Sequence, residues 1–226
     1  PTTMLSAAVP PHQPQLAREL RERVKDILVA CGMQEVISYS LTSLATLERT
    51  QAPEDGLHPL RLANPMSGEQ EYLRTNLRSS ILSTLAANQH HLREGLKLFE
   101  VGRAYMPRRP DMGAEQPGDL PLERETLVGA LAGPRGPESR FGETGPLDIY
   151  DTKGILETAL GQLRLEPTFG PAADPLFLSG RCASVTLGGT PLGTVGELHT
   201  RVLEQFDLDV SPVVLFEIDL ATLMSV

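Results

Sequence analysis

The side chains best suited to acid–base or phosphate chemistry lie on one apolar stretch of the sequence, Gly95–Arg108. Its apolar and β-branched content predicts a strand over residues 95–105. The stretch contains a carboxylate and a guanidinium three residues apart, Glu100 and Arg103. Residues three apart on a strand point to opposite faces, so these two cannot act together on one ligand. Their spacing therefore favours structural roles.

One face of this strand is the place to look for a phosphate site. Five residues share it by their alternation: Glu100, Gly102, Ala104, Met106 and Arg108. A phosphate site needs positive charge or backbone N–H groups at fixed positions. Met106 offers neither, and Arg108 lies beyond a proline. We therefore expect this face to be a filled cleft.

Other residues with chemical potential have simpler explanations. None of the five histidines has a metal-binding neighbour at a suitable spacing. Asp151 and Lys153 stand at a predicted helix start, where capping and solvation account for both. The paired glycines at 188–189 lack the strand–loop–helix context of a phosphate loop and predict a hairpin turn. The sequence predicts no catalytic, cofactor-binding or metal-binding residue in this chain.

Composition narrows the class of protein. The chain has 226 residues, of which 40% are hydrophobic, and a formal net charge of −9. Nucleic-acid phosphates repel such a chain unless its charges are strongly segregated, which disfavours an RNA-binding module. Two cysteines without metal spacing are typical of a reducing compartment, and no apolar run is long enough to span a bilayer. We expect a cytoplasmic protein with no membrane partner.

The clearest predicted element is a helix over residues 14–31, with Pro14 in its first turn and Gly32 at its C-terminal cap. Ala17, Val29 and Ala30 widen its apolar stripe beyond one face, and a helix of this kind usually packs against two neighbours. We therefore predict a subunit interface on this helix, formed by Leu16, Leu20, Val24, Ile27 and Leu28.

Further periodic segments complete the predicted fold. The expected strands cover residues 34–41, 60–62, 126–131, 183–187, 192–198 and 213–220. The expected helices cover 43–49, 76–92, a segment capped by Asp151 or Thr152, and 199–206. Together these elements predict an α+β fold, a mainly antiparallel sheet flanked by helices.

The two ends of the sequence indicate a piece of a longer protein. Residues 1–13 are proline-rich and aperiodic, which predicts an extended linker from a preceding domain. Residues 14–226 are predicted to form one core domain. The final segment, 215–226, is still apolar, as if the chain continued into a further domain.

Several segments resemble the signature motifs of class II aminoacyl-tRNA synthetases. The helix 14–31 and its following strand resemble the first motif. Residues 95–108 resemble the first strand of the second motif, which in working members ends in an aromatic residue, an arginine, any residue and a glutamate. Here Tyr105 is followed by Met106, Pro107 and Arg108. The arginine that would clamp the ATP α-phosphate and the glutamate are both replaced.

Two more segments keep their place in this resemblance and lack the chemistry. Residues 73–79 resemble the Leu-Arg-Thr-His-Thr-Ser segment of the catalytic phenylalanine subunit, with Asn76, Leu77 and Arg78 in place of substrate-holding groups. Residues 215–220 occupy the position of the third motif without its glycines or arginine. The order and spacing of these segments are similar to the core of the β subunit of bacterial phenylalanyl-tRNA synthetases.

The resemblance implies a structural role. In that family the β core keeps the synthetase fold without activity, and it associates with the catalytic α subunit as an (αβ)2 tetramer. ATP and magnesium would act on other parts of the holoenzyme, and tRNA(Phe) would be bound mainly by other domains. The chain would thus support ATP-dependent attachment of phenylalanine to tRNA as a noncatalytic component.

Two alternatives remain open at this point. The first is a stand-alone, diverged synthetase-like protein that binds ATP or regulates; it would need Arg74, Arg78 and Arg103 to converge on one pocket. The second concerns assembly, because the isolated chain would form a homodimer if the predicted interface on helix 14–31 is exposed.

Overall fold

A computed structural model describes residues 15–50, 58–90, 95–107, 120–136 and 145–224. Its centre is a seven-stranded sheet in the order β1-β4-β5-β9-β8-β7-β6. Only the β1–β4 pair is parallel. The strands are β1 Gln34–Glu35, β4 Leu96–Met106, β5 Leu122–Ala132, β9 Val213–Asp219, β8 Thr190–Leu198, β7 Phe177–Leu187 and β6 Pro167–Pro171.

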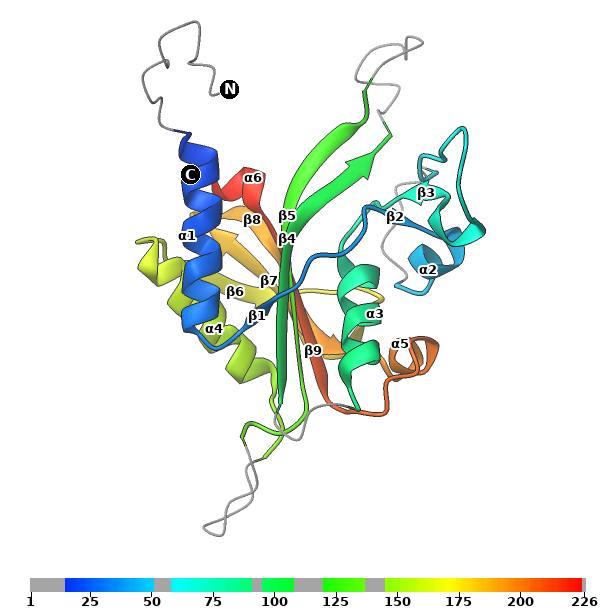
Figure 1. Ribbon diagram of the computed structural model, residues 1–226. Helices are drawn as coiled ribbons and strands as arrows, with labels where there is room; N and C mark the ends of the chain where they lie inside the picture. The colour runs from blue at the N-terminus through cyan, green and yellow to red at the C-terminus, as the bar shows by residue number, and fades with distance from the viewer. Residues whose placement is uncertain (1–14, 51–57, 91–94, 108–119, 137–144, 225–226) are drawn as a thin grey trace, which may run out of the picture.

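Three helices cover one face of the sheet, which we call the back face: α1 Leu16–Ala30, α4 Ile149–Gln162 and α6 Leu220–Leu223 (Figure 1). Their apolar residues pack with Phe99 and Phe216 from the sheet into one continuous core. A Cβ at Gly129 would collide with the ring of Phe216, so the close approach of this ring requires glycine on β5.

The opposite, front face is covered by α3 Arg78–Asn88 and α5 Thr200–Gln205 (Figure 1). A second core lies beneath them and includes the fully buried Leu77 and Val128. Beside α3 the chain forms α2 Leu44–Glu48, the 3-10 turn η1 Gly68–Gln70 and a small sheet of β2 Leu41–Thr42 and β3 Tyr72–Leu73. The predicted α+β class, a mainly antiparallel sheet flanked by helices, is confirmed.

Local sequence signals explain several boundaries. Gly32 follows α1 with φ +81°, as expected of a glycine after a helix C-terminus. Ser43 caps α2 by accepting a hydrogen bond from the Thr46 N–H. His199 caps α5 through Nδ1, which accepts from the Arg201 N–H.

Other boundaries differ from the predictions. The cap of α4 is Asp148 and not Asp151 or Thr152, because the two aspartates form a reciprocal capping box in which Asp151 is the third helical residue. The predicted strand 34–41 is confined to β1 and Leu41, because the chain leaves the edge of β4 after the Val36 N–H bonds the Phe99 carbonyl.

The far edge of the sheet is β6, a strand not predicted from the sequence. It begins at Pro167, ends at Pro171 and pairs antiparallel with β7. The Ala172 N–H, just beyond its end, still bonds the Cys182 carbonyl of β7.

Within the described residues, no helix is both long enough and apolar enough to cross a bilayer. The predicted linker, residues 1–13, lies outside the described part of the chain.

Candidate functional site

The front face carries a buried group of charges centred on Arg74, at the end of β3. Its Nη1 donates to Glu100 Oε1 of β4 at 2.8 Å and to Ser38 Oγ at 2.8 Å. Ser38 Oγ in turn donates to Glu100 Oε2 at 2.6 Å. The side chains of Arg74 and Glu100 are sealed from solvent at 3% and 2% exposure. Glu100 therefore has a structural partner here, and Arg103 is not that partner.

Arg74 also closes the outer edge of β4. Its Nε donates to the Arg103 carbonyl at 2.9 Å, and its own carbonyl accepts from the Tyr105 N–H at 2.9 Å. Beneath it, a Cβ on Gly102 would collide with the Arg74 guanidinium and crowd Leu77. The strand face predicted to be a possible phosphate site is thus occupied by protein side chains at Gly102.

A second buried guanidinium, Arg78, joins three distant segments. Its Nε donates to Glu217 Oε2 of β9 at 2.6 Å, and its Nη1 donates to Asp174 Oδ2 at 2.8 Å. The Asp174 carboxylate is fixed in turn by the Leu176 N–H. The guanidinium carbon lies 5.9 Å from the ring centre of Phe177, within the range of a cation–π contact.

The start of α3 holds Arg78 in this position. Asn76 Oδ1 accepts from the Arg78 N–H at 3.0 Å, which satisfies one of the free donors of the first turn. Leu77 is fully buried. The three predicted degenerate positions Asn76, Leu77 and Arg78 therefore serve helix capping, core packing and ion pairing.

Two pKa values follow from this arrangement. Burial alone would lower the pKa of Arg78, but Glu217 and Asp174 outweigh it and raise that pKa above its ordinary value. Burial and the nearby Asp174 carboxylate raise the pKa of the Cys182 thiol to about 11, against a smaller opposing effect of Arg78. Cys182 is therefore a protonated, unreactive thiol at neutral pH.

The charged side chains of the front face are paired with one another within the chain. We call Ser38, Arg74, Glu100, Arg78, Asp174 and Glu217 the front-face cluster. It contains two guanidiniums and three carboxylates, so an incoming phosphate would have to displace protein carboxylates. The third candidate, Arg103, points away and pairs with Glu123 on the exposed part of the β4–β5 hairpin. Arg74, Arg78 and Arg103 do not converge on one pocket.

The remaining degenerate positions lie at the end of β4. Met106 is half-buried and pairs with Leu122 of β5. Arg108 lies outside the described residues. In the part of the chain that the structure describes, no three His, Cys, Asp or Glu side chains form a metal-binding group.

The predicted interface residues of α1 divide into two groups. Val24 and Leu28 are buried in the chain's own back-face core, where a partner cannot reach them. Leu20 and Ile27 are half-buried against the same core. Leu16 is exposed, as is Val29 at the other end of the helix. The stripe therefore packs mainly on its own sheet and on α4.

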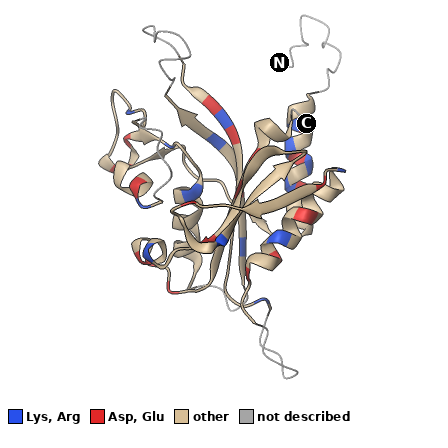
Figure 2. Ribbon diagram, turned by 180° about the vertical axis from the view of Figure 1, so that it is seen from behind, with Lys and Arg blue, Asp and Glu red and all other residues tan. Residues whose placement is uncertain are grey.

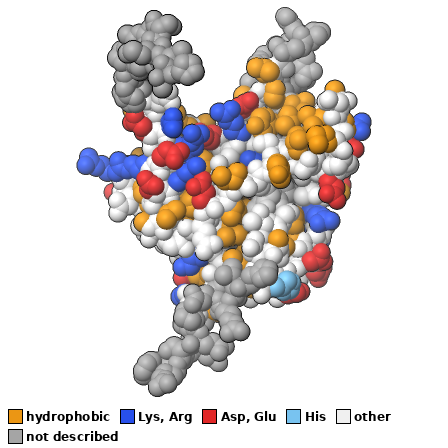
Figure 3. Space-filling view, in the orientation of Figure 1, with side chains coloured by type: hydrophobic (Ala, Val, Ile, Leu, Met, Phe, Trp, Pro, Cys, Tyr) orange, Lys and Arg blue, Asp and Glu red, His pale blue; other side chains and the backbone are white. Residues whose placement is uncertain are grey.

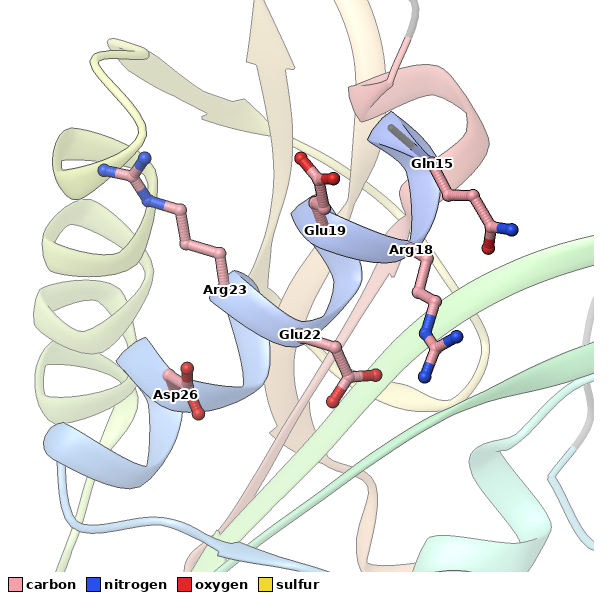
Figure 4. A pocket seen from close by; sticks show the side chains of 6 residues that line it. All are labelled: Gln15, Arg18, Glu19, Glu22, Arg23 and Asp26. Carbon is pink, nitrogen blue, oxygen red and sulfur yellow. The ribbon is translucent and has the colours of Figure 1, made fainter. Parts of the chain in front are cut away.

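The outer face of α1 is charged and has a shallow groove (Figure 4). The groove is lined by Gln15, Arg18, Glu19, Glu22, Arg23 and Asp26. Arg23 reaches the Gln162 carbonyl at the end of α4, and Glu22 is paired with Arg21. Arg18 and Asp26 have no ion-pair partner among the described residues. Charges of both signs are interspersed along this helix and on the β4–β5 hairpin (Figure 2).

An apolar surface lies on the segment that leaves β1. Ile37 and Tyr39 are 89% and 79% exposed, whereas Ser38 between them is drawn into the front-face cluster. We call Ile37 and Tyr39 the outward strip. Hydrophobic side chains also gather over β2 and β3, while the surface over α1 is mixed in charge (Figure 3).

Comparison with known proteins decides the family. A family model described as the phenylalanyl tRNA synthetase beta chain CLM domain matches residues 1–220. The chain belongs to this family. The phenylalanine–tRNA ligase β subunit of Dehalococcoides mccartyi strain CBDB1 is 35% identical over 231 residues, which cover all of this chain and 27% of the relative. That of Geobacter sulfurreducens is 33% identical over 228 residues, covering 99% and 28%.

These relatives confirm the resemblance seen in the sequence, and this family member spans about a quarter of their length. Among solved structures, PylSc of Desulfitobacterium hafniense, a pyrrolysyl tRNA synthetase, matches with a TM-score of 0.65 at 15% identity. The match covers 92% of this chain and 68% of that one. At this identity the likeness concerns the fold, which is that of a class II synthetase.

Sequence reasoning missed several members of the front-face cluster. No sequence pattern pointed to Asp174, and Ser38 and Glu217 lay only within segments that resemble degenerate motifs. The local signal was a charged side chain inside an apolar segment, since Glu217 directly follows four apolar residues of β9. Its partner Arg78 lies 139 residues away, which no local pattern reveals.

Proposed function

We propose that this chain is the noncatalytic structural core of a phenylalanine–tRNA ligase β subunit and binds the catalytic α subunit. One observation carries the noncatalytic part: the two buried guanidiniums of the front face are paired with carboxylates of the same chain. A nucleotide site needs guanidiniums free to meet phosphate. Membership of the phenylalanyl-tRNA synthetase β-chain family supports the proposed β-subunit role and the α-subunit partner.

The outward strip is the main candidate surface for the α subunit. Its two large, exposed apolar side chains lie two residues apart on one segment, and exposed apolar side chains that gather in a patch mark protein–protein interaction sites. Here Ser38, bonded to Glu100 and Arg74, holds the backbone so that its two neighbours face solvent. The strip is therefore presented by a rigid anchor, which lowers the entropic cost of docking.

The outer face of α1 adds a second, electrostatic part to this surface. Arg18 and Asp26 lie two turns apart on the groove-lining face without ion-pair partners among the described residues. Exposed Leu16 and Val29 flank them at the two ends of the helix. A partner helix with opposite charges would pair the charges and cover the apolar ends. The proposed interface thus includes the outer face of α1. Of the five interface residues predicted from the sequence, it retains only Leu16.

The remaining parts of the proposal concern the holoenzyme. ATP, magnesium and phenylalanine are handled by the α subunit, and tRNA(Phe) is bound mainly by parts of the protein outside this chain. The assembly is an (αβ)2 tetramer in the cytoplasm. In the absence of α, the same surface makes this chain prone to form homodimers.

Co-purification with the α subunit tests the proposal. The double variant Ile37→Asp/Tyr39→Asp places two charges on the outward strip and should abolish co-purification while circular dichroism stays unchanged. Tyr150 on α4 provides a matched control because it is exposed at 78%, against 79% for Tyr39. Tyr150→Asp should co-purify like the unaltered chain. Retention of α by the double variant would contradict docking through this strip.

Calorimetry with ATP tests the noncatalytic part separately. The purified chain should give no binding heat with ATP and magnesium, because its front-face guanidiniums are already paired. Binding in the millimolar range, lost in an Arg78→Lys variant, would overturn this part without affecting the docking surface.

A further inference from the structure

The Arg78 guanidinium uses only part of its hydrogen-bonding capacity. Nε binds Glu217 and Nη1 binds Asp174, each through a single oxygen. Nη2 donates to no acceptor in the described part of the chain. Nε and Nη2 lie on one edge of a guanidinium, the edge that grips a carboxylate or phosphate with two parallel bonds. Glu217 therefore occupies one donor of a two-donor edge.

Glu217 is also the most exposed member of this group. Its side chain is 19% exposed, whereas those of Asp174 and Arg78 are 7% and 8% exposed. The neighbouring Arg74–Glu100 pair is sealed at 3% and 2%. A small anion could thus approach Arg78 along the path that the Glu217 side chain now fills, and no comparable path leads to Arg74.

We propose that Arg78 forms an anion-binding seat that the chain fills with its own Glu217 carboxylate. The seat takes small oxyanions, either a carboxylate or phosphate, once this side chain is removed. The physical reason is the cost of leaving two buried guanidinium donors, Nε and Nη2 of Arg78, without an acceptor, which an added anion relieves. Asp174, held by the Leu176 N–H, and the ring of Phe177 keep Arg78 in place while the seat is empty.

The proposal is independent of the α-subunit docking surface. It explains instead how the fold keeps the buried Arg78 cation of α3 against the central sheet without binding free ligand. The side chain of Glu217 acts as a tethered ligand, present at an effective concentration that a dilute anion does not match.

Chemical rescue tests the seat. In the purified Glu217→Ala chain, thermal unfolding is followed with increasing sodium acetate, and with sodium chloride at equal ionic strength. We expect the Tm to rise with acetate and saturate, by roughly 3–6 °C at ten times the Kd, and to rise less with chloride. The unaltered chain should show no difference between the two salts.

The carboxylate partner of an exposed guanidinium provides the matched control. Glu197 pairs with Arg181, whose side chain is 62% exposed, so this guanidinium stays solvated when the carboxylate is removed. The Glu197→Ala variant should not distinguish acetate from chloride. Equal acetate responses in the two variants would show a general salt effect and overturn the proposal.

A second variant covers the case in which Glu217→Ala does not fold. Glu217→Thr also removes the carboxylate that fills the seat but keeps a polar, β-branched side chain suited to β9, and phosphate is then titrated against it by calorimetry. Saturable heat that is absent in the unaltered chain supports the seat. Absence of any specific anion effect in both variants means that Arg78 and Glu217 are only a structural pair, and the proposal fails.

Discussion

The front-face cluster and the outward strip meet at residues 37–39, where Ser38 belongs to the cluster and its two neighbours form the strip. The two regions nevertheless differ in burial and polarity. The cluster pairs its charges within the chain and keeps four of its five charged side chains at 8% exposure or less. The strip, one residue to either side of Ser38, leaves two large apolar side chains in solvent. The difference supports the proposed noncatalytic role, since the buried charges are paired within the chain while apolar surface stays open to the proposed partner.

Removal of a cluster cation should have the largest effect. Arg78→Ala leaves the carboxylates of Asp174 and Glu217 without their cation in a mostly buried site. Breaking such a group costs about 3–5 kcal/mol of the free energy of unfolding. Urea unfolding measures the loss. Arg103→Ala, which breaks a pair whose two side chains are both exposed, should change the urea midpoint little. Equal losses in the two variants would contradict the expected difference between buried and exposed ion pairs.

A smaller effect is expected from crowding the cluster. Gly102→Ala adds a Cβ against the Arg74 guanidinium, which is locked between Glu100, Ser38 and the Arg103 carbonyl. Overpacking of this kind costs about 1–3 kcal/mol. The measurement is again the urea midpoint, with Gly161→Ala on α4 as the control because open space surrounds that position. A urea midpoint for Gly102→Ala that is no lower than that for Gly161→Ala would contradict the tight packing of the Arg74 guanidinium against β4.

The outward strip should respond in the opposite way. Ile37→Ser removes a side chain that is 89% exposed, so stability should change by less than about 0.5 kcal/mol. Affinity for the α subunit should nevertheless fall, because the side chain is part of the proposed docking surface. Val36→Ser, one residue earlier and half-buried against the front-face core, should lower stability instead. If the Ile37→Ser chain kept full affinity for the α subunit, Ile37 would not be part of the docking surface.

The smallest effect concerns the thiol beside the cluster. The folded pKa of Cys182 is about 11, above its ordinary value of 9.0, mainly because of burial. The stability it contributes is complete below pH 9 and is lost as the pH rises towards 11. Alkylation rates of a Cys31→Ser chain should therefore rise with an inflection near pH 11. An inflection near pH 9 would mean that burial and Asp174 do not act on this thiol.

The sequence predicted the elements whose signals are local. The stripe of α1, the alternation of β7 and β8, and the helix starts at Ser43 and His199 all depend on neighbouring residues. The cap of α4 was misplaced because Asp148 and Asp151 are both capping residues, and only the reciprocal geometry distinguishes them.

The candidate site was less predictable because its pairs are distant in sequence. Arg78 was singled out as a residue in the place of a substrate group, but its partners Asp174 and Glu217 lie 96 and 139 residues further on. The predicted interface depended on the stripe of α1, and periodicity cannot say which part of a wide stripe the chain's own sheet covers. Val24 and Leu28 were therefore assigned to a partner although they lie in the core.

The prolines of β6 have a consequence for how this molecule behaves at high concentration. The Ala172 N–H faces β7, so by alternation the N–H groups of Thr168 and Gly170 face it too. The opposite side of the strand then presents positions 167, 169 and 171, and proline at two of them leaves Phe169 as the only outward N–H donor of the strand. Such an edge is a poor template for recruiting a further strand, which protects the sheet from growing into aggregates at this end.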